Sequence, residues 1–476
     1  MSDIASATSQ VSPSQAHIPA IEDLAAWAAQ AAGGEISRLD RLPGGNRRQA
    51  WAVDVRTGSR GGPQEYLLRF DPGAADDDDP YSIRREAVIC VALFDAGVLI
   101  PEVIATHPEA EAVLVRRIPG QADFRMLADP ARRAAIAQDF MRRLAELHAA
   151  RVDHGAFGAA PDLDVPAAVV SELTRWERMH RATGVADPLI EYALRWLTTH
   201  VPCVPQPPVV VHGDTGPGNF LYQGEQVTAI IDWELAHLGD PMEDLAWLSL
   251  RAAQEGWPDF PASLRQYAAA SRWPVQHERI RYHRVFAELR VVIIRHRSRW
   301  SGDRGPAGEL GNSLLSQGLH RRLCVEAMAD ASQVRLLPPP PLQAAADPSD
   351  WVTDAILEQL RRDVVPRTSD PVAASRAKGV ARGVKFLRSE RRLGASAERA
   401  DVGDLSALLG HGVPTAAAGQ QLLAARIRNG SADDAAVLSY LGRLVSRETE
   451  LLADAMGALA ARHLPPLPEA DNGGPR

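Results

Sequence analysis

The fold is decided by residues 209–246, which read VVVHGDTGPGNFLYQGEQVTAIIDWELAHLGDPMEDLA. The opening run of three valines predicts a short strand, and the Gly- and Pro-containing stretch after it predicts a loop that carries Asp214 and Asn219. The residues that follow predict a β-hairpin that returns the chain to Asp232. A strand, a loop and a returning hairpin are expected to bring these three polar side chains close together.

Phosphoryl transfer requires side chains of these types. A hydroxyl nucleophile needs a carboxylate that orients it and accepts its proton, and the metal ions that neutralise the phosphates need carboxylate and amide oxygens. Asp214, Asn219 and Asp232 supply one such set. Taken singly, each has an ordinary structural interpretation: Asp214 as a helix cap, Asp232 as a turn residue, and the neighbouring His212 as a core histidine.

The same stretch resembles the aminoglycoside phosphotransferase and choline kinase superfamily. Its loop fits the pattern H-x-D-x-x-x-x-N, and the segments IDWE and GDPMEDLA match two further motifs in the same order. The resemblance implies that Asp214 is the catalytic base and that His212 braces the catalytic loop. It also implies that Asn219 and Asp232 bind magnesium, with assistance from Glu234.

Two aspartates in the last motif have structural interpretations. Asp240 precedes Pro241 and is expected to cap the helix that begins there. Asp244 is expected to tie the loop to that helix.

A kinase-like fold also needs a nucleotide site near the amino terminus. The family's nucleotide loop corresponds to a segment containing Gly44, Gly45 and Asn46, which on its own indicates only a turn. The resemblance places Arg69 where most relatives have lysine, and Glu86 could hold it by an ion pair. No lysine precedes Lys378, so Arg69 is the natural substitute. The alternative is that Arg69 and Glu86 form a surface pair of little energetic value.

The resemblance implies an α+β, two-lobed protein-kinase-like fold with an antiparallel-sheet N-lobe and a mainly helical C-lobe. Helical periodicity after a proline-rich linker predicts a C-terminal all-α domain in addition. The predicted domains are a disordered tail at 1–20, a nucleotide-binding N-lobe at 21–120, a catalytic and substrate-binding C-lobe at 121–334, a linker at 335–350 and a helical accessory domain at 351–476.

Composition excludes several other classes. The chain has 476 residues and a net charge of -8, so it lacks the basic balance of a nucleic-acid-binding protein. No apolar run is long enough to span a membrane, and the first residues do not resemble a signal peptide, which predicts a cytoplasmic location. The three cysteines are far apart and have no ligand pattern around them, so neither disulfides nor a zinc site is expected.

The resemblance therefore predicts an ATP- and Mg²⁺-dependent small-molecule kinase that phosphorylates a hydroxyl group. Six arginines between Arg281 and Arg299 favour an anionic acceptor, and the resemblance to kinases associated with acyl-CoA dehydrogenases indicates a hydroxyacyl group carried on coenzyme A. Aminoglycoside, choline-like and sugar acceptors stay open. The alternative class is a catalytically weak nucleotide-binding pseudokinase that binds a protein partner, or itself, through its C-terminal helical domain.

Overall fold

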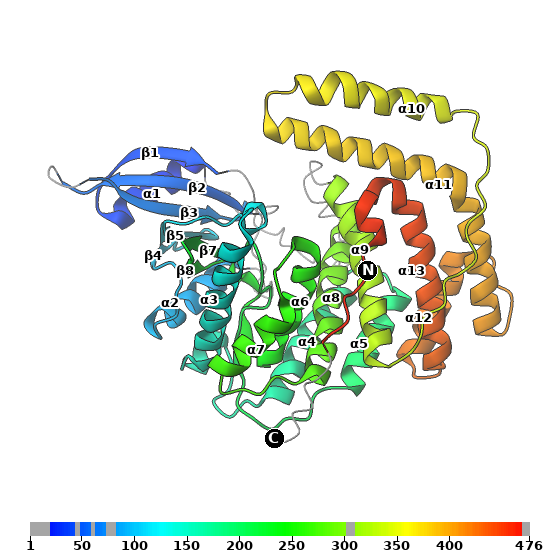
Figure 1. Cartoon of the computed structure of the whole chain (residues 1–476), viewed down its shortest axis with the longest axis horizontal. Helices are drawn as coiled ribbons and strands as arrows, with labels where there is room; N and C mark the ends of the chain where they lie inside the picture. The colour runs from blue at the N-terminus through cyan, green and yellow to red at the C-terminus, as the bar shows by residue number, and fades with distance from the viewer. Residues whose placement is uncertain (1–19, 43–47, 59–61, 73–81, 301–309, 469–476) are drawn as a thin grey trace, which may run out of the picture. The chain divides into compact units, whose positions relative to one another are not determined.

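The protein was analysed as a computed structural model, which describes residues 20–42, 48–58, 62–72, 82–300 and 310–468. The chain forms two compact units (Figure 1). Unit 1 comprises residues 1–91 and 101–117, and unit 2 comprises residues 92–100 and 118–476. Unit 1 is built around an antiparallel sheet and unit 2 is mainly helical, so the predicted fold class is confirmed.

The sheet of unit 1 has five antiparallel strands in the order β1-β2-β3-β5-β4. Their bounds are β1 Glu35–Arg41, β2 Gln49–Arg56, β3 Gln64–Phe70, β4 Val103–Thr106 and β5 Ala112–Arg116. β2 and β3 form an antiparallel hairpin. The two edge strands were not predicted, because β1 is largely polar and exposed and β4 has only four residues.

Two helices cover opposite faces of this sheet. Leu68 lies in the core that includes residues of α1 (Ile21–Ala32), whereas Val113 packs against residues of α2 (Ile83–Asp95). Successive side chains of a strand point to opposite faces, so Arg69 is directed away from α1. Arg69 is also the register partner of Val113, which places it on the face that α2 covers.

Unit 2 begins with helices and then places two short β-ribbons beside them. The helical elements up to α9 are η1 Phe124–Met126, α3 Pro130–Ala149, η2 His154–Phe157, α4 Val165–Arg181, α5 Pro188–Thr199, η3 Trp233–Leu235, α6 Pro241–Glu255, α7 Phe260–Ala270, α8 His277–Trp300 and α9 Leu310–Ala331. The strands are β6 Val209–Val211, β7 Phe220–Gln223, β8 Gln226–Ile230 and β9 His237–Gly239. The predicted hairpin is confirmed as β7 and β8, and β6 pairs with β9.

The C-terminal part of unit 2 is helical, as predicted. It contains α10 Asp350–Gln359, η5 Leu360–Val364, η6 Val365–Arg367, α11 Pro371–Leu409, α12 Ala416–Arg428, α13 Asp434–Met456 and η7 Gly457–Ala461. Arg321 of α9 pairs with Glu448 of α13 at 2.8 Å, and Arg428 of α12 pairs with Glu191 of α5 at 2.7 Å. These helices therefore pack against α5 and α9. The predicted domain boundaries stay predictions.

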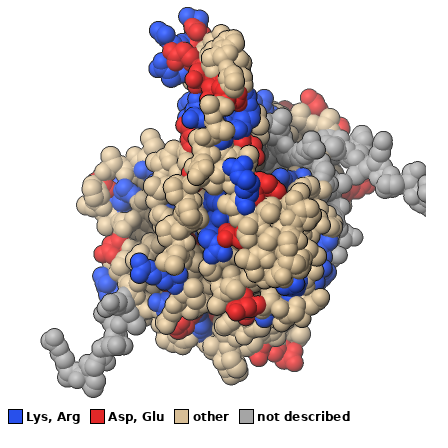
Figure 2. Space-filling view, turned by 90° about the vertical axis from the view of Figure 1, so that its right-hand side faces the viewer, with Lys and Arg blue, Asp and Glu red and all other residues tan. Residues whose placement is uncertain are grey.

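Charged side chains of both signs are interspersed on the face of the molecule that Figure 2 shows. Among the described residues, none of the helices combines the length and the hydropathy that crossing a membrane requires.

Candidate active site

The loop after β6 is anchored by one buried carboxylate. Asp244 of α6 has no exposed surface, and it accepts hydrogen bonds from the backbone N–H groups of His212 (2.8 Å) and Gly213 (3.0 Å). The Thr215 hydroxyl also donates to it, and His148 Nε2 lies 3.1 Å away. Burial alone would raise the pKa of Asp244, but the hydrogen bonds and nearby histidines lower it below its ordinary value. The expected tie between loop and helix is confirmed.

His212 links the loop to the segment that carries Asp232. Its Nδ1 accepts a hydrogen bond from the backbone N–H of Asp214 at 3.3 Å, so its Nε2 carries the proton and donates to the carbonyl of Ile231 at 2.9 Å. The ring also packs against Trp233, with 4.8 Å between ring centroids. Buried His212 therefore lies in the core and is hydrogen-bonded to both segments.

Asp214 and Asn219 are in direct contact. The Asn219 side-chain amide donates to the Asp214 backbone oxygen at 2.7 Å and to its carboxylate at 2.8 Å. This arrangement leaves the amide oxygen of Asn219 as its remaining ligand atom. Asp214 keeps about a quarter of its side-chain surface exposed, so its carboxylate is accessible from solvent.

Asp232 follows β8 in a left-handed backbone conformation, with φ at 69°. The backbone N–H of Ile231 donates to the Asn219 carbonyl at 2.9 Å, which joins the Asp232 segment to the loop. Glu234 lies two residues further, in η3, and is half-buried. The sequence motifs are therefore brought together, as predicted from their spacing.

Arg251 was missed in the sequence. It lies on α6 and donates to the Asp214 carboxylate at 2.8 Å, and it also bonds to the carbonyl of Pro217. Arg251 follows Asp244 by seven residues, which is about two helical turns on one face of α6. That spacing was the available signal. A helix that holds the start of the loop through Asp244 also places Arg251 beside the following residues of the same loop.

We expect Gly216→Ala to lower kcat/KM by about ten- to a hundredfold. Gly216 has φ at 153°, and an added Cβ would lie 2.8 Å from Cβ of Arg251, so the loop would have to shift. Gly224→Ala is the matched control, because Gly224 also has a positive φ but has nothing within 4 Å of the added carbon. Kinetics and thermal melts of both variants test this expectation. An equal loss of activity in both would contradict it.

In unit 1, Glu86 joins two arginines. Arg69 donates to Glu86 at 2.6 Å, and Arg48 forms a second ion pair with the same carboxylate. Glu86 is only 4% exposed, so the interpretation as a surface pair is wrong. Burial alone would raise the pKa of Glu86, but the two guanidinium groups lower it below its ordinary value. Arg48 was missed in the sequence because it precedes β2 and meets Glu86 of α2 only when that helix packs on the sheet.

We expect Glu86→Gln to lower the free energy of unfolding by about 3 kcal/mol at neutral pH, because two buried cations lose their counter-ion. The ionised Glu86 contributes stability above its ordinary pKa of 4.5, and this contribution is lost as the pH falls through the lower folded-state pKa. The difference between native protein and variant should therefore shrink in acid. Urea unfolding at several pH values measures it.

Glu102→Gln is the matched control for this experiment. Glu102 pairs with Arg116 at 2.7 Å, but about two fifths of each side chain is exposed. Its loss should cost less than about 1 kcal/mol. Equal losses in Glu86→Gln and Glu102→Gln would contradict the expectation.

The other predicted nucleotide-loop residues, Gly44, Gly45 and Asn46, lie outside the described residues. Within the part of the chain that the structure describes, no group of three or more His, Cys, Asp or Glu side chains could hold a metal ion. The three cysteines are free thiols.

The arginines of α8 do not support the inference of an anionic acceptor. Buried Arg290 pairs with Glu243, and buried Arg284 donates to Ser249 at 2.8 Å. Arg281 pairs with Glu278 at 2.6 Å. Arg284 and Arg290 thus lie in the helical core and Arg281 is paired, so the number of arginines in this segment does not measure the charge of a binding site.

Comparison with known proteins identifies the family. The model of the "Phosphotransferase enzyme family" matches residues 38–281, just over half of the chain. Acyl-CoA dehydrogenase family member 10 from Mus musculus is 28% identical over 201 residues, which cover 39% of this chain and 18% of that protein. Member 11 from Gallus gallus is 27% identical over 228 residues, which cover 43% of this chain and 29% of that protein. The chain thus spans less than a third of the length of either relative.

Part of the chain is also similar to solved structures. A macrolide 2′-phosphotransferase from Brachybacterium faecium is 20% identical, with a TM-score of 0.42, and the match covers 60% of this chain and 95% of that chain. The family match includes β2, β3, Asp214 and the whole of the anchored loop. The predicted family is confirmed: the chain belongs to the phosphotransferase enzyme family.

Proposed function

We propose that the protein transfers the γ-phosphoryl group of ATP to a hydroxyl group of a small molecule. The observation that supports this most strongly is the contact between Asp214 and Asn219 on a loop whose backbone is fixed by buried Asp244. Phosphoryl transfer depends mainly on positioning and on charge stabilisation, and an anchored loop with an accessible carboxylate supplies the first of these.

Asp214 is the proposed catalytic base, and His212 is the proposed brace of its loop. The acceptor oxygen forms a bond to the γ-phosphorus while its proton passes to the Asp214 carboxylate. The bond between the γ-phosphorus and the bridging oxygen breaks, and ADP leaves with the electron pair. Asn219 and Arg251 hold the carboxylate from two sides, which restricts its orientation toward the acceptor.

Asn219, Asp232 and Glu234 are the proposed magnesium-holding residues. Magnesium prefers oxygen ligands and is commonly held by one or two carboxylates together with substrate phosphates. The amide oxygen of Asn219 and the carboxylates of Asp232 and Glu234 are ligand atoms of this kind, so the residues fit the ion. When bound, magnesium would neutralise charge on the phosphates.

Arg69, held by Glu86, is the proposed cation for the nucleotide phosphates, and Gly44, Gly45 and Asn46 belong to the proposed nucleotide loop. Arginine is permanently charged and presents a planar set of donors, so it can bind phosphate oxygens in pairs. The proposed division keeps 21–120 as the nucleotide-binding lobe and 121–334 as the catalytic lobe.

For the acceptor we propose a hydroxyacyl group carried on coenzyme A. The similarity to acyl-CoA dehydrogenase family members 10 and 11 supports this choice, although it extends over only part of those proteins. Aminoglycoside, choline-like and sugar acceptors are the alternatives within the same reaction class.

A nucleotide-binding pseudokinase is the second candidate, with the C-terminal helices as its partner-binding or self-association surface. Arginine in place of the usual lysine at position 69 is the observation that favours it. The presence of Asp214, Asn219 and Asp232 favours catalysis, because binding alone does not require this set.

The test is ADP release from ATP by the purified protein with hydroxyacyl-CoA, aminoglycoside, choline-like and sugar acceptors. We expect one acceptor class to stimulate ADP release, and we expect chelation of magnesium or Asp214→Ala to abolish the stimulation. If no acceptor stimulates release while Mg–ATP still binds to the native protein, the result contradicts the proposed function and favours the pseudokinase.

A further inference from the structure

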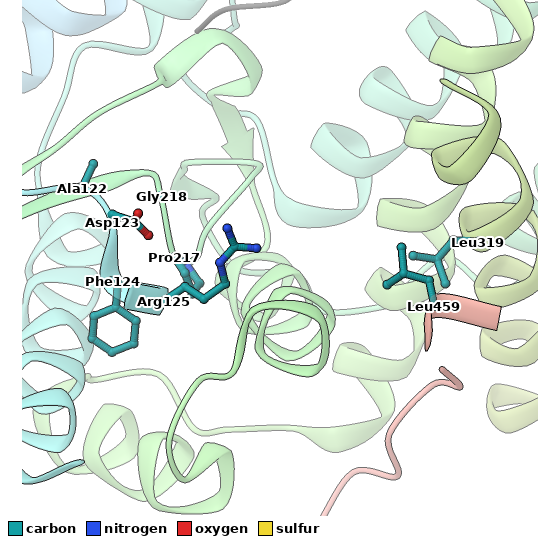
Figure 3. Close-up of a pocket in the computed structure, with 8 residues that line it drawn as sticks. All are labelled: Ala122, Asp123, Phe124, Arg125, Pro217, Gly218, Leu319 and Leu459. Atoms are coloured by element: carbon teal, nitrogen blue, oxygen red, sulfur yellow. The ribbon is translucent and has the colours of Figure 1, made fainter. Parts of the chain in front are cut away.

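A pocket of about 420 Å³ lies beside the loop that carries Asp214, within unit 2 (Figure 3). The loop contributes Pro217 and Gly218 to one wall, and residues 122–125 continue that wall. Leu319 of α9 and Leu459 of η7 form the wall opposite. The volume is within the range of small-molecule sites.

The wall beside the loop is anchored in the core. The ring of Phe124 points away from the two leucines and packs against Phe220 and Trp257, at 5.7 and 5.3 Å between ring centroids. Arg251 bonds to both the carbonyl of Pro217 and the carboxylate of Asp214. One side chain thus fixes the pocket wall and the proposed base together.

The opposite wall is held by side chains that bind the backbone of the C-terminal segment. Buried Arg322 of α9 donates to the carbonyls of Leu459 at 3.0 Å and Ala460 at 2.6 Å. Glu326 accepts from the backbone N–H of Leu464 at 2.8 Å. These bonds set the path of η7 and place Leu459 in the wall, so the C-terminal region beyond the matched family residues completes the pocket.

The chemistry of the walls selects against a polycation. Asp123 and Arg125 are the charged lining residues, and their charges cancel. An aminoglycoside would therefore meet one carboxylate together with one guanidinium. The far wall consists of two leucine side chains. Leu319 is only 5% exposed, so Leu459 offers most of the apolar surface of this wall, and burial of that surface against a ligand is favourable.

We propose that this pocket receives the acyl chain of the acceptor, with Leu459 as the residue that determines preference for chain length. The inference rests on the proposed function, because it assigns the acceptor site of that reaction. It also gives the C-terminal helices a role within the enzyme, since they carry Leu459.

The test uses hydroxyacyl-coenzyme A esters from butyryl to decanoyl length, with binding measured by calorimetry and phosphoryl transfer measured separately. For the native protein, affinity should rise by up to about fourfold per added methylene until the pocket is filled. Leu459→Asp should flatten this dependence, because a carboxylate replaces the apolar wall. Leu459→Trp, which fills the pocket without adding charge, should reject the longer chains and keep the shorter ones.

Leu422→Asp is the matched control, since Leu422 of α12 is 45% exposed and is not a lining residue of the pocket. It should keep the native dependence on chain length. If phosphoryl transfer occurs and neither Leu459 variant changes its dependence on chain length, the assignment of the pocket is overturned. The proposed function would still stand in that case. If the esters bind with an affinity that depends on chain length, the Leu459 variants change that dependence, and no phosphoryl group is transferred, the result supports the pocket. It would contradict the proposed function. Absence of binding by the native protein at every length would overturn the pocket.

Discussion

Asp214→Asn is expected to reduce kcat by about a hundred- to ten-thousandfold, because the variant loses the group that accepts the acceptor's proton. The side chains are nearly the same size, and the bond from Asn219 to the backbone carbonyl at position 214 can persist. The KM for ATP should therefore change little. Steady-state kinetics in the presence of a stimulating acceptor measures both quantities.

Asp95→Asn is the control for this substitution. Asp95 is exposed at the end of α2, and its replacement should leave kcat at the native value. If Asp214→Asn kept more than about a tenth of native kcat, Asp214 would not be acting as a general base.

Asp244→Asn is expected to lower the free energy of unfolding by about 3 kcal/mol and to impair catalysis as well. Backbone N–H groups, the Thr215 hydroxyl and His148 all surround the native carboxylate. An amide would turn its own N–H₂ group toward some of these donors and leave them unsatisfied. Because the loop backbone would then shift, kcat should fall even for enzyme molecules that remain folded.

Thermal unfolding and kinetics at low temperature separate these two effects. Asp129→Asn is the control: Asp129 caps α3 by accepting from the backbone at 2.9 Å, and asparagine caps a helix about as well as aspartate. Native-like melting of Asp244→Asn would show that the loop does not depend on this carboxylate.

Local patterns were sufficient to predict much of this molecule. The motif residues His212, Asp214, Asn219 and Asp232 lie within one short stretch, so their proximity follows from a strand, a loop and a hairpin. The pairing of Arg69 with Glu86 was expected from the family resemblance. Their side of the sheet follows from the alternation of residues in β3.

The contacts that were missed are those that join distant parts of the chain. Arg48 reaches Glu86 only after β2 and α2 meet on the sheet, and the sequence contains many arginines of equal appearance. The return of the C-terminal segment was also not predictable. Arg322 holds it through backbone carbonyls, which every residue possesses and which leave no signature in a sequence.

The central claim is phosphoryl transfer with Asp214 as the base, and mass spectrometry of the acceptor tests it most directly. After incubation with ATP and magnesium, a hydroxyl-containing acceptor should gain the mass of one phosphoryl group with the native protein. The gain should be lost in Asp214→Asn and retained in Asp95→Asn. An acceptor phosphorylated equally by the native protein and by Asp214→Asn would contradict the account.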